Sequence, residues 1–388
     1  MTPEPVIVAC GRFPIGRAFK GSLVDWRPDD LAASVVEKVL DQMPALDRAS
    51  IDDLICGCGL PGGEQGFNLA RIVSILTRLN CPGTTVTRYC ASSLQATRMA
   101  AHAIRAGEGD VFLSVGVESV TRYQYGTSDM PACRNPRLEP GNPDGFPDIY
   151  IQMGETAEIV AEREGVSRAE MDRFALRSQE RAVAAQDSGF FAQEIVPVPL
   201  GDGTPMTADD GPRRNTSLER LAALEPTFRE GGRVTAGNSC PLNDGAAAVL
   251  VMSDSRARAL RIPPLARIVA TGLSALEPEV MGLGPVDASR QALARAGMSM
   301  DDIDLLEINE AFAAQVIPAA RGLGVDPFDD RLNPHGGAIA LGHPFGMSGA
   351  RILCTLLNGL RSGGGQIGLE TMCVGGGMGM AMIVERLG

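Results

Sequence analysis

The chain has 388 residues, a length at which one hydrophobic core stops growing, so two lobes of similar size are expected. A hydrophobic content of 44% and aperiodic glycine and proline exclude collagen-like and disordered proteins, and a net charge of −12 without a basic run argues against nucleic acid or an anionic membrane as partner. Nine irregularly spaced cysteines, no long apolar segment and no signal-like N-terminus predict a cytoplasmic protein with reduced thiols.

Predicted strands and helices alternate through the first part of the chain. VIVACG indicates a buried strand, residues 29–40 a helix with two acidic residues in its first turn, and SIDDLICGCG another strand. The β-branched stretch 84–88 predicts a strand, and 92–106 predicts a helix that ends at Gly107. Strands that are apolar on both faces and alternate with helices favour parallel-rich sheets covered by helices, most simply as two α/β lobes.

The texture of the sequence changes in the middle of the chain. A run rich in Pro, Gly and Asn at 127–146 precedes two amphipathic helices, MGETAEIVAEREG and SRAEMDRFALRSQERAVAAQ. We interpret the stretch 119–245 as an insertion. It is either a packing domain or a cover for a substrate site, and the sequence leaves both interpretations open.

The order strand, helix, strand returns in the second part of the chain, as RIVATG, a helix at 287–296 and SMDDIDLLEINEAF. Ala9 matches Ala270, Asp52 matches Asp301, and Cys90 matches His343, so we infer a duplicated unit. The predicted domains are 1–262, which contains the insertion, and 263–388.

Cys90 lies at a predicted strand-to-helix corner. The unpaired N–H groups and the positive end of the helix dipole face such a position, which favours a thiolate and suits a nucleophile. The alternative is a buried cysteine that acts as a small hydrophobic side chain.

Only three histidines are present, and two lie in NPHGGAIALGHPFGMSGAR, ahead of a predicted helix at 348–360. By the duplication His343 occupies the corner equivalent to that of Cys90, so the two corners can bring an imidazole to a thiol, as in base-activated sulfur nucleophiles. A histidine in a glycine-rich turn is otherwise structural, and His102, on a buried helix, is assigned to packing.

Two further segments place polar groups at strand ends. Asn309, in EINEAF, can orient a water or donate to a carbonyl oxygen, although an asparagine in a turn is the commoner reading. In TMCVGGGMG, Cys373 precedes glycines, and Gly375 can supply an oxyanion donor. Cys56 and Cys58 point the same way from one strand without further ligands at zinc spacing, so no metal site is predicted.

Four segments together, RYCASSLQA, NEAF, GGAIALGHPFGMSGAR and MCVGGGMG, resemble the thiolase family. The similarity extends through MGETAE, TAGNSCPLNDGAAA and MGLGPV and so covers nearly the whole chain. It implies an α/β thiolase fold: two duplicated βαβαβαββ halves in α/β/α/β/α layers, with a loop domain inserted in the first half. It also implies a homodimer, or a homotetramer made of two dimers, with coenzyme A as a substrate and no permanently bound cofactor.

The resemblance implies a role for each matching residue. Cys90 is similar to the acylated nucleophile, His343 to its activating base, and Cys373 to the acid/base that acts on the α-carbon. His343 and a water held by Asn309 would form one oxyanion hole, and the N–H groups of Cys90 and Gly375 the other. The implied coenzyme A contacts are Met153, Arg213, Phe228, Ala236, Cys240 and Phe312.

The expected activity is CoA-dependent cleavage of a 3-ketoacyl-CoA to acetyl-CoA and a shortened acyl-CoA, reversible as a Claisen condensation. Three positions depart from the pattern of the family. Short-chain biosynthetic members have His at the position of Gln152 and Ser-Gly at Cys240-Pro241, and these two changes favour a degradative enzyme of fatty acid β-oxidation. The third is Thr87, where relatives often have Asn. The alternatives are a biosynthetic acetoacetyl-CoA thiolase and a non-catalytic acyl-CoA-binding protein. A decarboxylating ketoacyl synthase fits less well, because NEAF and Cys373 stand where its His or Asn groups would be.

Overall fold

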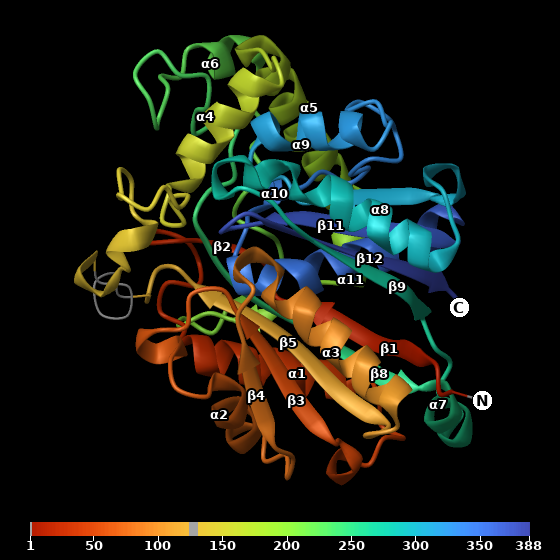
Figure 1. Ribbon diagram of the computed structural model, residues 1–388. Coiled ribbons are helices and arrows are strands. Elements are labelled where there is room, and N and C mark those ends of the chain that lie inside the picture. Colours follow the sequence, from red (N-terminus) through yellow and green to blue (C-terminus); the bar gives the residue numbers. More distant parts are fainter. Residues whose placement is uncertain (1, 124–130) are drawn as a thin grey trace.

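A computed structural model describes residues 2–123 and 131–388 (Figure 1). The strands of the first half are β1 (Pro5–Arg12), β2 (Gly16–Arg17), β3 (Asp53–Cys58), β4 (Gly83–Val86), β5 (Val111–Ser119) and β8 (Asn243–Ser253). Those of the second half are β9 (Ala266–Ala275), β10 (Leu305–Ile308), β11 (Ile367–Val374) and β12 (Met378–Arg386).

Helices flank these strands in both halves. The first half has α1 (Pro28–Asp41), α2 (Leu69–Leu76), α3 (Ser92–Ala106) and α7 (Asp254–Leu260). The second has α8 (Gly284–Ala296), α9 (Ala313–Gly322), α10 (Ala338–Leu341) and α11 (Phe345–Gly363). Between β5 and β8 lie α4 (Met153–Arg163), α5 (Arg168–Asp187), α6 (Leu218–Ala222) and a small ribbon of β6 (Val198–Pro199) and β7 (Pro205–Met206).

The two halves repeat one sheet topology. In the described part of the chain, a 10-stranded sheet runs β10-β11-β12-β9-β1-β8-β5-β3-β4, with β2 beside β8. The order β3-β5-β8-β1 has the same parallel and antiparallel pairings as β10-β11-β12-β9, and the halves join where β1 meets β9. The predicted duplication is therefore confirmed.

One residue match within that duplication is wrong. The backbone N–H of Asp52 bonds the carbonyl of Val111 at 2.8 Å, and its side chain accepts the N–H groups of Asp110 and Val111, which fixes β3 beside β5. Asp304, not Asp301, does this in the second half: it bonds the carbonyl of Ile367 at 2.9 Å and accepts the N–H groups of Gln366 and Ile367. The sequence did not reveal this match, because Asp301 and Asp304 lie three residues apart in one acidic segment.

The expectation of parallel-rich sheets is also wrong. Only β3–β4, β3–β5 and β10–β11 are parallel among the described strand pairs. β11 turns straight back into β12 through Gly376 and Gly377, both with positive φ, and such a hairpin is antiparallel. In the first half the chain returns to the sheet as β8 after the insertion, which has the same effect.

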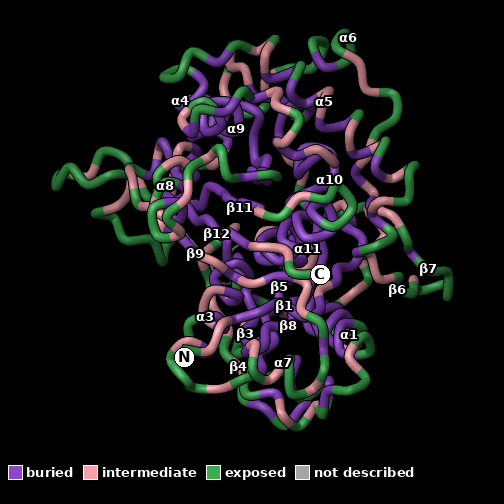
Figure 2. The backbone as a smooth tube through the Cα atoms, turned by 90° about the vertical axis from the view of Figure 1, so that its right-hand side faces the viewer, coloured by how far each residue is buried: buried purple, intermediate pink, exposed green. Residues whose placement is uncertain are grey.

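The buried apolar side chains form three cores, and their positions agree with the predicted order of layers, α/β/α/β/α. The outer cores lie under α1 and α2 on one side and under α8 and α9 on the other, and the central core surrounds α3 and α11 (Figure 1). Figure 2 shows this interior as a continuous buried region. The turn before α3, which holds Cys90, and the turn before α11, which holds His343, both border this central core. The strand-to-helix corner predicted for His343 is wrong, because the short helix α10 and not a strand precedes α11.

Glycines let α11 press against its neighbours in the central layer. A Cβ at Gly349 would lie 2.6 Å from the backbone N of Leu94 in α3, and one at Gly346 would lie 2.4 Å from the carbonyl of Val117 in β5. The Ser93 hydroxyl accepts the N–H of Ala350 at 2.9 Å. The close approach of α11 to α3 and β5 therefore requires residues without a side chain at Gly346 and Gly349.

The inserted helices cover the second half of the molecule (Figure 1). Ala157 and Phe174, from α4 and α5, share a buried core with Ile308 and Phe312. The insertion is thus packed firmly on this half. The predicted loop 127–146 falls partly outside the described residues. In the part of the chain that the structure describes, no helix is long and apolar enough to cross a membrane.

Candidate active site

Cys90 lies in a short 3-10 turn, Tyr89–Ala91, between β4 and α3. The preceding Tyr89 has a φ of 42°, a conformation that bulky residues rarely adopt and that marks a constrained turn. The cysteine is half-buried at the wall of a cavity of about 470 Å³. This cavity, called the acyl cavity below, is lined by Gly59, Leu60, Tyr89, Cys90, Cys133, Arg134, Ile149, Tyr150, Ile151, Met153, Phe345, Gly375 and Gly376.

The expectation of a thiolate at rest is wrong. Burial raises the pKa of the Cys90 thiol to about 12, against the opposing hydrogen bonds from the N–H groups of Gly375 and of Cys90 itself. The helix α3 begins only at Ser92, so its positive end does not outweigh desolvation. Cys90 and Gly375 line the same cavity, and the oxyanion hole expected from their N–H groups stays a prediction.

His343 is held between two polar side chains and is almost fully buried, at 1% exposed. Its Nε2 lies 3.3 Å from Asn309 Nδ2, and its Nδ1 lies 2.6 Å from Ser348 Oγ. Because an amide nitrogen only donates, Nε2 carries the lone pair and Nδ1 the proton. Ser348 accepts that proton and donates its own to the carbonyl of Pro344, which fixes the tautomer.

Burial, aided by the positive charge of Arg351, lowers the pKa of His343 to about 3. The imidazole is therefore neutral at physiological pH, and its Nε2 lone pair accepts the hydrogen bond from the Asn309 amide. The Cys90 thiol is protonated as well, so the two groups to which the family resemblance gives the proton transfer form an uncharged pair at rest and not a thiolate–imidazolium ion pair. Such a pair acts by general-base transfer during attack.

Asn309 follows β10 directly and is 1% exposed. Its backbone N–H bonds the carbonyl of Thr371 in β11 at 3.0 Å, and its Nδ2 reaches His343. Its Oδ1 is buried without a hydrogen-bond partner in the described structure. An unpaired buried acceptor is costly, so this atom suits a bound water or a substrate donor.

Three sulfurs gather at the centre of the site. Burial raises the pKa of Cys373, at the end of β11, and of Cys240, and the nearby sulfur of Cys90 raises both further. Cys373 is fully buried, whereas Cys240 is half-buried and bonds the carbonyl of Ala311. The second thiol predicted for the chemistry thus lies beside the first.

The predicted coenzyme A contacts fall into two groups. Phe228 and Phe312 stack edge to face at 6.1 Å, Phe228 also packs on Gly154 next to Met153, and Ser239 beside Cys240 bridges Phe312. Met153, Phe228, Cys240 and Phe312 therefore belong to one wall.

Two other predicted contacts are separate from that wall. Ala236 and Arg213 are exposed, and the N–H of Arg213 donates to Gln179 of α5.

Glu118 was not recognised from the sequence. This buried carboxylate, at the end of β5, accepts the N–H groups of Gly59 and Gly346, both at 2.8 Å, that of Leu60 at 3.2 Å, and the side-chain amide of Gln65. It joins the wall of the acyl cavity to the first turn of α11, just after His343. The signal was a single acidic residue in the apolar run VFLSVGVES.

Two models of known protein families match this chain. The thiolase N-terminal domain model matches residues 5–255, and the thiolase C-terminal domain model matches residues 262–386. The chain belongs to the thiolase family. It is therefore an acyltransferase.

Similar thiolases include the 3-oxoadipyl-CoA/3-oxo-5,6-dehydrosuberyl-CoA thiolase of Escherichia coli K12, 44% identical over 97% of this chain and 98% of that one. A 3-ketoacyl-CoA thiolase of Serratia proteamaculans is 44% identical over 98% and 99%. The crystal structure of the Bacillus anthracis acetyl-CoA acetyltransferase superimposes with a TM-score of 0.91 at 35% identity, covering 100% of this chain and 99% of that one. These likenesses confirm the predicted family and fold.

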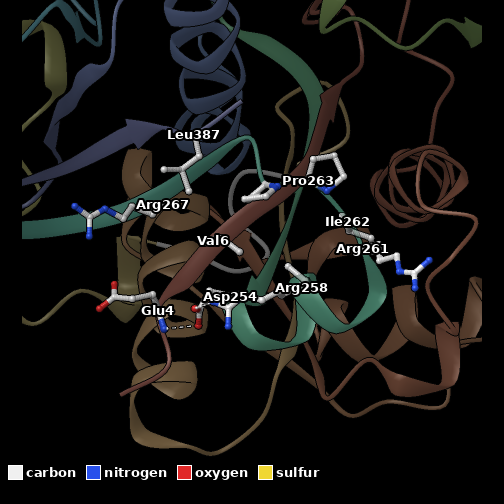
Figure 3. A pocket seen from close by; sticks show the side chains of 11 residues that line it. Glu4, Val6, Asp254, Arg258, Arg261, Ile262, Pro263, Arg267 and Leu387 are labelled. Carbon is white, nitrogen blue, oxygen red and sulfur yellow. Dashed lines mark hydrogen bonds and ion pairs between the residues drawn. The ribbon is translucent and has the colours of Figure 1, made fainter. Parts of the chain in front are cut away.

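Other features of this thiolase lie away from the site. A cavity of about 730 Å³ lies between Glu4, Asp254 and Leu387, where Arg267 points away from Arg258 and Arg261 (Figure 3). No candidate residue lines it.

His102, assigned to packing, is instead exposed, because its position on α3 faces solvent. In the described ranges no group of three or more His, Cys, Asp or Glu is placed to hold a metal.

Proposed function

We propose that this thiolase cleaves 3-ketoacyl-CoA through an acyl-enzyme on Cys90, with the roles of the site residues as the family resemblance implies. The observation that carries the proposal is that Cys90 and Gly375 line one cavity, with Cys373 close enough to Cys90 for the two sulfurs to interact electrostatically. Nucleophile, oxyanion donor and second thiol thereby come from two distant segments of the chain, around Cys90 and around Cys373.

In the first half-reaction the Cys90 sulfur attacks the 3-keto carbon while His343 Nε2 takes its proton. The transient oxyanion is stabilised by one of two donor sets, the N–H groups of Cys90 and Gly375 or His343 with a water held by Asn309. The C2–C3 bond then breaks, its electron pair forms the acetyl-CoA enolate, and the Cys373 thiol protonates the α-carbon. The neutral resting pair supports this order, because no charge has to be buried before substrate arrives.

In the second half-reaction the thiol of coenzyme A gives its proton to the Cys373 thiolate and attacks the acyl-enzyme. The bond from the acyl carbon to the Cys90 sulfur breaks, the sulfur takes back its proton from His343, and the shortened acyl-CoA is released. We place coenzyme A against the wall of Met153, Phe228, Cys240 and Phe312, with Ala236 and Arg213 farther out. Because Ala236 and Arg213 are exposed, they suit contact with the nucleotide end of coenzyme A. The proposed domains remain 1–262, with the insertion 119–245, and 263–388.

We propose the degradative direction and a cytoplasmic location. The nine free cysteines support a reducing compartment. The relatives are named for 3-ketoacyl-CoA and for 3-oxoadipyl-CoA, so the acyl chain belongs either to β-oxidation or to a path that degrades acids with a second carboxylate.

We also propose that the chain forms a homodimer, alone or as half of a tetramer. Strand β4 ends the sheet with an unpaired edge, and Phe67, Ile75 and Leu76 beside it are 95%, 60% and 47% exposed. An open strand edge next to exposed apolar side chains favours pairing with a second copy.

Turnover of 3-ketoacyl-CoAs of rising chain length, with and without CoA, tests the activity directly. We expect CoA-dependent loss of the Mg²⁺–enolate absorbance and formation of acetyl-CoA. His343→Ala should lose at least ~10³ in kcat, since it removes a general base and an oxyanion donor, while KM for CoA changes little. A His343→Ala variant within tenfold of wild type would refute the assigned role.

A further inference from the structure

The acyl cavity holds one charged side chain, Arg134, among its described lining residues. Most of the other side chains on its wall are apolar or aromatic: Leu60, Tyr89, Ile149, Tyr150, Ile151, Met153 and Phe345. None is acidic. Arg134 and Cys90 line the same cavity, so an acyl group on the sulfur extends into a space that contains a cation.

Arg134 is held in place without being neutralised. Its guanidinium lies 5.2 Å from the centre of the Tyr150 ring, and the Tyr150 hydroxyl accepts the N–H of Asn135 at 3.0 Å, which fixes that ring. Arg134 makes no ion pair with any residue that the structure describes. Its donors are therefore available to a ligand.

A neighbouring arginine in the same segment behaves differently. Arg137 also lies over an aromatic ring, that of Phe146 at 4.9 Å, but it pairs with Asp144 at 2.6 Å and does not line the cavity. The contrast indicates that the free cation belongs to the cavity and is not a general property of the loop. Arg137 is also a matched control.

An aliphatic tail offers nothing to a guanidinium and leaves its donors to water, whereas a carboxylate pairs with it by two parallel hydrogen bonds. We propose that Arg134 binds a terminal carboxylate on the acyl chain, so that the preferred substrates are 3-ketoacyl-CoAs derived from dicarboxylic acids. This inference rests on the proposed thiolase activity at Cys90 and names its substrate class.

A phosphate of coenzyme A is the other anion that could reach Arg134. Met153 is the only predicted coenzyme A contact that also lines the acyl cavity; Phe228 and Phe312, which belong to the same wall as Met153, do not line it. The position of Arg134 with Tyr89, Leu60 and Cys90 therefore favours the acyl side. A carboxylate on the acyl chain and a phosphate of coenzyme A would give different kinetics when Arg134 is replaced.

The test compares pairs of substrates that differ only at the end of the chain: 3-oxoadipyl-CoA with 3-oxohexanoyl-CoA, and 3-oxosuberyl-CoA with 3-oxooctanoyl-CoA. Each is measured as kcat/KM with wild type, Arg134→Gln, Arg134→Lys and Arg137→Gln. We expect wild type to prefer the carboxylated member of at least one pair by ~10–100-fold, the range of a hydrogen bond to a charged group. Arg134→Gln should abolish this preference, Arg134→Lys should keep part of it, and Arg137→Gln should leave it intact.

The proposal is overturned if wild type shows no preference in either pair, or if Arg134→Gln keeps the preference. It is also overturned if Arg134→Gln raises KM for all four substrates and for CoA alike, since that result assigns the arginine to coenzyme A. Failure of wild type to cleave any of the four substrates would instead refute the proposed activity, which keeps the two claims separate.

Discussion

At the scale of single residues, the proposed catalytic pair of Cys90 and His343 is uncharged because desolvation is the largest influence on the pKa of each group. Desolvation raises the pKa of an acid such as Cys90 and lowers that of a base such as His343, so both shifts favour the neutral forms. Local sequence predicted the reverse for Cys90, since a helix start favours thiolate. The sign was decided by tertiary burial, which no spacing of residues reveals.

The neutral pair predicts how alkylation depends on pH. Iodoacetamide should modify Cys90 at a rate that keeps rising from about pH 6 to about pH 9, because the thiolate fraction grows tenfold per unit below the pKa. The exposed Cys133 serves as an internal reference and should react faster than Cys90 at neutral pH. Peptide mapping measures both. A Cys90 rate that levels off by pH 7 would indicate an ion pair and contradict this account.

Glu118 predicts a positioning effect. Glu118→Gln replaces one acceptor oxygen by an NH₂ group that faces N–H donors from Gly59, Leu60 and Gly346, so the loop before α11 should shift. We expect kcat to fall by ~10–100-fold with little change in KM for CoA, since the coenzyme A wall is elsewhere. Equal kcat in the variant and wild type would show that these hydrogen bonds do not position His343.

At the scale of elements, the sequence predicted most helices and strands and the duplication, because these depend on local patterns. It did not predict that α11 lies tightly against α3, nor that Asp304 replaces Asp301 in the repeat. Such features depend on which residues lack a side chain at a crossing and on the register between distant strands. The donors to Glu118 likewise come from segments about sixty and about 230 residues away.

The crossing of α3 and α11 can be tested with two glycines of one helix. Gly349→Ala places a Cβ 2.6 Å from Leu94 and should cost ~1–3 kcal/mol, with a lower Tm and reduced kcat. Gly363→Ala, at the other end of α11, has no heavy atom within 4 Å and should be neutral or slightly stabilising. Equal Tm values for the two variants would show that the close approach is not needed.

At the scale of the whole molecule, an open strand edge and an apolar surface beside it predict a second copy. Light scattering after size-exclusion chromatography should give a dimer or tetramer for wild type and smaller particles for Ile75→Asp, which places a charge in the predicted interface. Leu387 is also 47% exposed but lies near the C-terminus, away from β4, so Leu387→Asp should not change the size. A monomeric wild type would contradict the proposed assembly.

The proposed mechanism requires the two thiols, Cys90 and Cys373, to act at different steps. Intact mass spectrometry after incubation with acetyl-CoA, followed by peptide mapping, measures this for wild type, Cys90→Ala and Cys373→Ala. We predict one acetyl group on Cys90 in wild type and, more slowly, in Cys373→Ala, and none in Cys90→Ala. Acetylation of Cys373 or Cys240 in Cys90→Ala, or an unmodified Cys90 in wild type, would contradict the assignment of the nucleophile.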